Sequence, residues 1–203
     1  MDKRLLRLVA VLAIMLFAAM QARAEEFKDG IRVITITESP DSATWESEPE
    51  INNVSRALDA ADSAFPYIAE LPLSADIQRY LYDAWTAAGY DYSIALGLID
   101  VETGGTFNPD AINHNTHDYG LFQINRKSWF STCKRLFGIT EMTQMLDPVL
   151  NIQAALYVYG DCVDRYGQTE RALVAYNTGY GKHSSTQYSR KVLAAAEKWR
   201  ALL

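Results

Sequence analysis

Apolar residues recur at helical spacing through most of the chain after Leu73, which predicts a series of amphipathic helices. The first follows Ser74, a favourable N-cap residue, and ends at Gly89. The second begins at Asp91 and runs to Glu102. Further helices are expected at 127–137, from Asp147-Pro148 to Gly167, at 169–177 and at 186–202. The pattern predicts a mainly α fold.

One stretch interrupts this pattern, between Glu102 and Asn125. Glycines, a proline and short polar residues first indicate a loop. In 118–125 apolar and polar residues then mix at strand-like spacing. We therefore expect one short β/loop insertion. Gly120 is expected there because the backbone either adopts a positive φ or approaches another segment closely.

The first 24 residues have the pattern of a secretory signal peptide. Lys3, Arg4 and Arg7 precede an apolar run of about 13 residues, and small residues follow at Ala22 and Ala24. The run is shorter than the roughly 20 residues that span a bilayer, so we expect export and no membrane span after cleavage. The alternative is an uncleaved membrane anchor. The host compartment, periplasm or cell wall and exterior, stays open.

Residues 25–72 are expected to form a loosely structured acidic leader, followed by the folded domain at 73–203. Residues 25–75 hold 11 acids and 3 bases, a net charge of −8. Within it, the segment from Glu38 to Glu50 is acidic and rich in Ser, Pro and Asp, which is typical of a linker. The whole chain carries a formal charge of −6 and shows no basic face for nucleic acid.

The two cysteines, Cys133 and Cys162, allow two interpretations. Outside the cytoplasm an even number favours a disulfide. Both residues also lie on helical patterns, where a free cysteine packs as a small hydrophobe. The three histidines lack zinc-ligand spacing, so we expect neither a metal site nor another cofactor.

Glu102 is the strongest candidate for chemistry, because it ends an apolar helical run beside the polar loop. Partial burial disfavours the charged carboxylate and raises its pKa. Such a group donates a proton near neutrality, as a general acid must. The neighbouring polar loop would hydrogen-bond a hydroxyl-rich ligand. The alternative is a solvated glutamate at a helix end.

Four segments in order resemble the soluble lytic transglycosylase (SLT) domain of the lysozyme-like superfamily. They are Glu102 with Phe107-Asn-Pro-Asp-Ala111, Tyr119-Gly-Leu-Phe-Gln-Ile-Asn125, Leu146-Asp-Pro-Val-Leu-Asn-Ile152 and Ala175-Tyr-Asn-Thr-Gly179. The resemblance covers roughly 73–193. It implies a helical, lysozyme-like domain that cuts peptidoglycan glycan strands between N-acetylmuramic acid and N-acetylglucosamine.

The resemblance also implies residue roles. Glu102 would act as acid and then base, the muramic acetamido group would assist, and the 6-hydroxyl would attack to give a 1,6-anhydro product. Tyr176 would orient Glu102, next to Asn177 of the same Tyr-Asn pair. Gln123 would line the sugar cleft, and contacts to N-acetyl groups are expected from Asn113 and Asn125. The family usually has serine after the glutamate, where this chain has Thr103. The chain also adds Gly104-Gly105-Thr106 and has a short tail to Tyr188.

Asp118 has two possible roles. Its sequence context also resembles animal-type lysozymes, in which this aspartate is the second carboxylate of a retaining hydrolase. Otherwise it braces the loop by accepting hydrogen bonds. Four aromatic side chains would either stack on sugars or belong to the core; these are Tyr119, Phe122, Trp129 and Tyr180.

Three functions follow as hypotheses. The first is an exported lytic transglycosylase acting on peptidoglycan glycan strands. The second is a hydrolytic muramidase that uses Glu102 and Asp118. The third is a non-catalytic wall-binding component of a secretion, conjugation or phage apparatus, machinery that an active enzyme would also be able to serve.

Overall fold

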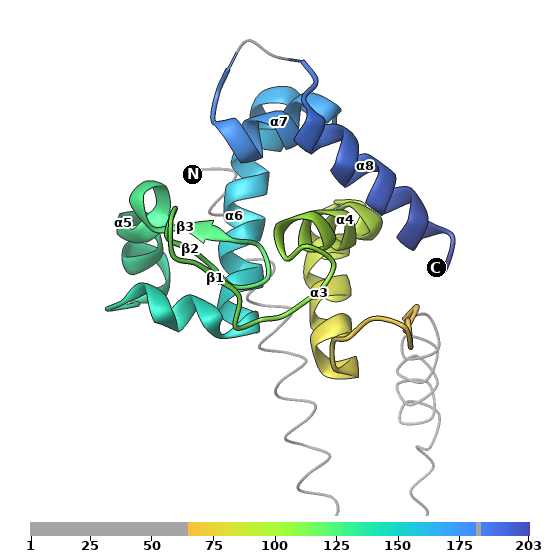
Figure 1. Ribbon diagram of the computed structural model, residues 1–203, viewed down its shortest axis with the longest axis horizontal. Helices are drawn as coiled ribbons and strands as arrows, with labels where there is room; N and C mark the ends of the chain where they lie inside the picture. Colours follow the sequence, from red (N-terminus) through yellow and green to blue (C-terminus); the bar gives the residue numbers. More distant parts are fainter. Residues whose placement is uncertain (1–64, 182–183) are drawn as a thin grey trace, which may run out of the picture. The chain divides into compact units, whose positions relative to one another are not determined.

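The computed structural model describes residues 65–181 and 184–203. The predicted signal peptide and the leader up to residue 64 lie outside the described residues. The described part is mainly helical, as predicted, and none of its helices has the length and apolarity to cross a membrane. Its helices are α3 (Ala75–Ala87), α4 (Tyr92–Glu102), α5 (Arg126–Phe137), the short 3-10 helix η1 (Met142–Leu146), α6 (Pro148–Tyr166), α7 (Glu170–Thr178) and α8 (Gln187–Arg200) (Figure 1).

The helices begin where the capping residues in the sequence predict. The side chain of Asp91 accepts a hydrogen bond from the Ser93 amide at 2.9 Å, and Asp147 caps α6 in the same way, ahead of a proline at the first helical turn. α5 begins one residue earlier than expected, because Asn125 is its N-cap. Helix η1 has no counterpart in the predicted elements.

Packing begins slightly upstream of Leu73. Ile68 and Leu71 are both buried. The fully buried side chain of Gln78 in α3 accepts from the Ile68 amide at 3.0 Å and donates to the carbonyls of Ile68 and Leu73. The last residues of the predicted leader are therefore tied to the first helix of the domain.

The insertion after α4 forms a small antiparallel sheet of three two-residue strands, which confirms the predicted β/loop element. The strands are β1 (Ile112–Asn113), β2 (Asp118–Tyr119) and β3 (Ile124–Asn125), paired in the order β1-β2-β3. Tyr119 lies opposite Ile112 on one side and Ile124 on the other. The tight turn between β2 and β3 brings Gly120 and Phe122 against Asn151 of α6.

Helix α6 lies between the sheet and α5 on one side and α4 on the other (Figure 1). An aromatic stack joins three elements at its centre. The buried ring of Trp85 in α3 stacks on Phe122 at 5.4 Å and on Tyr159 of α6 at 5.5 Å. Phe122 is thereby part of the core and not a sugar-stacking residue. This stack fixes the position of the neighbouring residue, Gln123, which faces the functional site.

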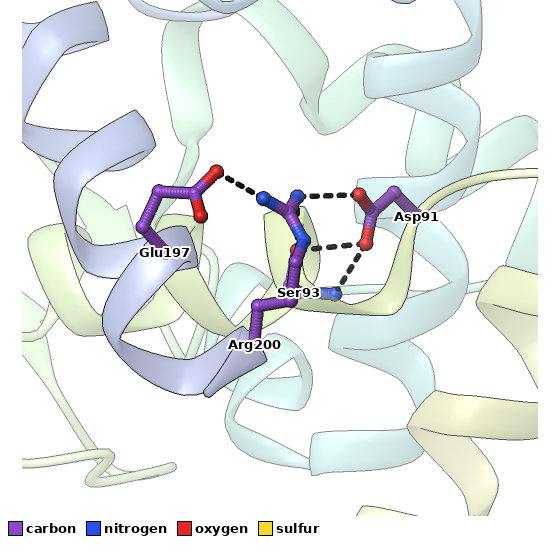
Figure 2. Close-up of polar contacts among 4 residues, drawn as sticks. All are labelled: Asp91, Ser93, Glu197 and Arg200. Atoms are coloured by element: carbon purple, nitrogen blue, oxygen red, sulfur yellow. Dashed lines mark hydrogen bonds and ion pairs between the residues drawn. The ribbon is translucent and has the colours of Figure 1, made fainter. Parts of the chain in front are cut away.

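Helices α4 and α8 approach each other unusually closely. A Cβ atom at Gly97 would lie 2.5 Å from the Val192 carbonyl oxygen, so only glycine fits there. At the far end of this contact Arg200 of α8 binds Asp91 at 2.6 Å and Ser93 at 2.8 Å. Figure 2 shows how these side chains and Glu197 lie together. The Arg200 contacts and the close approach at Gly97 together set the position of α8 relative to the end of α4.

Candidate active site

A cleft of about 580 Å³ opens between the sheet, α5, α6 and α7. It brings together most of the residues that the sequence predicted for the site, namely Glu102, Asp118, Gln123, Asn125, Tyr176 and Asn177. Two predicted contacts, Asn113 and Tyr119, are not among the lining residues. Asn113 is exposed in β1, where its side-chain oxygen accepts from the backbone amide of Asn115. The Tyr119 carbonyl accepts from Asn151.

Glu102 ends α4 and is largely sheltered from solvent at the cleft wall. Burial raises the pKa of this carboxyl from 4.5 to about 7. A hydrogen bond from Tyr188 acts in the opposite direction, and the charge of Asp118 raises the pKa further. The side chain therefore exchanges a proton near neutral pH, which is the property required of a general acid that later serves as base.

The hydroxyl of Thr103 connects Glu102 to the loop. It donates to the Ile99 carbonyl at 2.7 Å and accepts from the Phe107 amide at 2.9 Å. Phe107 is buried with a φ of 50° and packs edge-on against Trp199 of α8 at 5.3 Å. Threonine thus supplies a hydroxyl that holds the end of α4 and the start of the longer loop in one arrangement.

The tyrosine that contacts Glu102 is Tyr188, not Tyr176. The Tyr188 hydroxyl donates to Oε1 of Glu102 at 2.5 Å. The Tyr176 hydroxyl donates instead to the Phe122 carbonyl at 2.8 Å, which holds the turn that carries Gln123. Tyr176 does line the cleft, so its role is to support the opposite wall. Tyr176 extends from α7 to that turn, whereas Tyr188 lies on α8, the helix that packs against α4.

A polar cluster fixes the first turn of α8, where Tyr188 lies. The buried Ser189 hydroxyl accepts from the Thr186 amide at 2.8 Å and donates to Glu170 at 2.7 Å. The Ser185 hydroxyl donates to the same Glu170 oxygen at 2.6 Å. These bonds lower the pKa of the Glu170 carboxyl. The sequence predicted a helix over 186–202 but not the contact of its first turn with Glu170.

Asp118 is held by its neighbours on both carboxylate oxygens. Oδ1 accepts from the side-chain amide of Asn125 at 2.6 Å, and Oδ2 accepts from the Thr116 hydroxyl. Asn125 also donates to the Thr116 carbonyl and caps α5 through Ser128. Asp118 and Asn125 therefore brace the sheet at the cleft edge, and Asp118 presents a fixed negative charge to the site.

The turn that carries Gln123 is fixed by Asn151, a buried residue for which the sequence indicated no role of its own. Asn151 of α6 accepts from the Phe122 amide and donates to the Tyr119 carbonyl, each at 2.8 Å. Gly120 has a φ of 76°, and a Cβ there would lie 2.3 Å from the side-chain nitrogen of Asn151. The positive φ and the close approach therefore both require glycine at this position. Gln123 itself, at a φ of 46°, donates to the Gly120 carbonyl at 2.8 Å.

Part of the cleft lining is apolar and includes Trp129, Val158 and Cys162. Trp129 is partly exposed and packs edge-on against Tyr157, which leaves part of its ring at the cleft. Both Cys133 and Cys162 are buried free thiols, so the second interpretation of the cysteines holds in this structure. Within the described residues no group of three or more His, Cys, Asp or Glu side chains is arranged to hold a metal ion.

A family model described as transglycosylase SLT domain matches residues 80–198, a range that contains both walls of the cleft. The chain belongs to this family. Two curated relatives match this chain over most of their own length. Invasion protein IagB of Salmonella typhimurium is 28% identical over 125 residues, covering 59% of this chain and 77% of that protein. X polypeptide of Escherichia coli is 29% identical over 123 residues, 58% of this chain and 71% of its own.

No solved structure matches this SLT domain significantly. The family match supports the predicted lysozyme-like helical fold and a peptidoglycan-cleaving function of the lytic transglycosylase type. It also shows that the sequence resemblance was correctly assigned.

Proposed function

We propose that the protein is a peptidoglycan lytic transglycosylase that cleaves the β-1,4 bond between N-acetylmuramic acid and N-acetylglucosamine with formation of 1,6-anhydro-N-acetylmuramic acid. The observation that carries the proposal is Glu102, a sheltered carboxyl with a pKa of about 7 at the wall of a cleft in an SLT domain. Protonated Glu102 donates its proton to the glycosidic oxygen as the bond to C1 breaks. A general acid at such a position contributes about 10²–10⁴ in rate.

The second half of the reaction returns the proton. The acetamido oxygen of the muramic residue bonds to C1 as the leaving sugar departs. The carboxylate of Glu102 then takes the proton of the 6-hydroxyl, whose oxygen attacks C1 and displaces the acetamido oxygen. No water is consumed, and Glu102 is again protonated. Tyr188 positions the carboxyl throughout, and Gln123 and Asn177 bind sugar groups along the cleft.

A hydrolytic muramidase is the second candidate, because Asp118 lies at the same cleft as Glu102. Both oxygens of Asp118 already accept hydrogen bonds, which favours a bracing and electrostatic role over nucleophilic attack. Mass spectrometry of muropeptides released from purified sacculi separates the two reactions. Anhydro-muramic ends support the transglycosylase, and reducing ends indicate hydrolysis. Under the first reaction Asp118→Asn is mild and Glu102→Gln is inactive.

A wall-binding component without activity is the third candidate, and it predicts binding to sacculi with no released muropeptides. We further propose export through a cleaved segment at 1–24, action in the periplasm or at the cell wall, and service to a larger secretion, conjugation or phage assembly. The name of the Salmonella relative, an invasion protein, is in keeping with such service. Mass measurement of the mature N-terminus after expression in a bacterial host tests the cleavage.

A further inference from the structure

Helix α6 contributes apolar residues to the cleft lining and carries a cation one turn farther on. Val158 and Cys162, four residues apart, both line the cleft. Arg165 lies three residues after Cys162 and seven after Val158, which places it on the same helix face, one turn farther on. A guanidinium group therefore follows directly after these two apolar residues.

Arg165 is part of a strip of two arginines and two tyrosines at this end of the cleft. Its guanidinium carbon lies 3.9 Å from the ring centroid of Tyr180, a cleft-lining residue that is 49% exposed. The ring of Tyr166 lies 6.4 Å from that of Tyr180, and Arg171 of α7 stacks on Tyr166 at 4.5 Å. We call Arg165, Tyr180, Tyr166 and Arg171 the Arg-Tyr strip.

The two arginines of the strip lie against ring faces, and within residues 65–181 and 184–203 their N–H groups are left for another partner. Among the ion pairs of the described residues, Arg79 and Arg200 bind carboxylates, whereas Arg165 and Arg171 do not. Stacking on an aromatic ring orients the planar guanidinium without using its hydrogen-bond donors. An oriented guanidinium edge binds a carboxylate through two parallel hydrogen bonds.

We propose that the Arg-Tyr strip binds the carboxylates of the short peptide that the muramic residue carries on its lactyl group. This inference rests on the proposed function, because it assumes a peptidoglycan strand in the cleft. Neutral sugar rings alone give no reason for two cations at the cleft end, whereas a peptide with free carboxylates matches them in charge. The strip makes the enzyme selective for peptide-bearing over bare glycan strands.

The test compares cleavage of intact sacculi with cleavage of glycan strands stripped of peptide by an amidase. The wild-type protein is expected to cut intact strands at least about fivefold faster, the effect of one or two exposed charge pairs. The double variant Arg165→Ala, Arg171→Ala should lose this preference while its rate on bare strands stays unchanged. Arg135→Ala, an exposed arginine of α5, serves as the control and should keep the preference.

Equal wild-type rates on the two substrates overturn the inference and leave the proposed function intact. A double variant that retains the preference also overturns it. If the double variant slows on both substrates, the single variants Arg165→Lys and Arg171→Lys decide. Lysine keeps the positive charge but loses the planar guanidinium edge that binds a carboxylate through two hydrogen bonds. An unchanged preference in both lysine variants then contradicts recognition by the guanidinium edge. Absence of cleavage of either substrate refutes the proposed function itself, and the inference falls with it.

Discussion

The hydroxyl of Tyr188 lies 2.5 Å from Oε1 of Glu102, although 86 residues separate them in sequence. This contact joins the first turn of α8 to the last residue of α4. It stabilises the carboxylate form of Glu102, and so it opposes the burial that raises the pKa of that group. One hydrogen bond across the α4–α8 contact therefore positions the proposed acid and partly offsets the rise in its pKa that burial causes.

Removal of this hydroxyl should change the pH dependence of activity. In Tyr188→Phe the pKa of Glu102 rises, because the bond that favours its charged form is lost. The alkaline limb of the kcat/KM profile, near pH 7 in the wild type, should move to higher pH, and the maximal rate should fall about tenfold or more. A steady-state pH series with a soluble glycan substrate measures both. An unmoved limb would contradict the positioning role.

Tyr176→Phe is the matched comparison, and its effect should fall on stability. Its hydroxyl bonds the Phe122 carbonyl, so its loss leaves a sheltered acceptor unpaired at a cost of about 1–3 kcal/mol. The pH limb should stay where it is. Urea unfolding together with the same pH series separates the two tyrosines. If Tyr176→Phe shifts the limb and Tyr188→Phe does not, the roles assigned here are reversed.

Glu102 should cost the fold stability above neutral pH. In the unfolded chain it ionises from about pH 4.5, whereas in the folded protein it stays protonated up to about pH 7. Stability therefore falls as the pH rises through this window and stays lower above it. The difference corresponds to at most about 3 kcal/mol. Glu102→Gln should match the wild type at pH 4 and exceed it at pH 8 in urea unfolding.

The control for this experiment is Glu70→Gln, since Glu70 is exposed. That variant should follow the wild type at both pH values. Equal stability of Glu102→Gln and wild type at pH 8 would show that Glu102 is not sheltered, and would remove the basis of its assignment as the acid.

Gly97→Ala should destabilise the domain despite the better helix propensity of alanine. Its Cβ would meet the Val192 carbonyl oxygen at 2.5 Å and the Ala196 nitrogen at 2.9 Å, both backbone atoms that cannot move alone. Separation of α4 and α8 should cost about 1–3 kcal/mol and also lengthen the Tyr188–Glu102 contact, so activity falls too. Gly160→Ala, whose nearest neighbour is a tyrosine hydroxyl at 3.0 Å, should be milder. Thermal melts and activity assays compare them.

The cysteines should remain free thiols. Both are buried, and burial raises the pKa of Cys133 to about 11, which keeps it in the unreactive thiol form. Alkylation without reductant should label neither residue in the native protein and both in denaturant, as read by intact mass. A native mass two hydrogens lower, with no labelling in denaturant, would show a disulfide instead.

The sequence determined the local features of this protein. Ser74, Asp91 and Asp147 mark helix starts through short-range capping, and glycines mark the stops, because these signals act within one turn of chain. The sequence also predicted the polar insertion and the position of Glu102 at the end of an apolar helix. The ordered segments that resemble the SLT domain identified the family for the same reason, since each is a short local pattern.

Only the tertiary structure decided which distant groups meet. It placed Tyr188 and not Tyr176 on Glu102, set Asn151 under the turn of Gln123, and brought Arg165 against Tyr180. Each contact depends on how helices cross, and crossings such as that at Gly97 follow from the packing of many side chains at once. Residue spacing along the chain carries no such information, because a hydrogen bond extends about 3 Å in space whatever the separation in sequence.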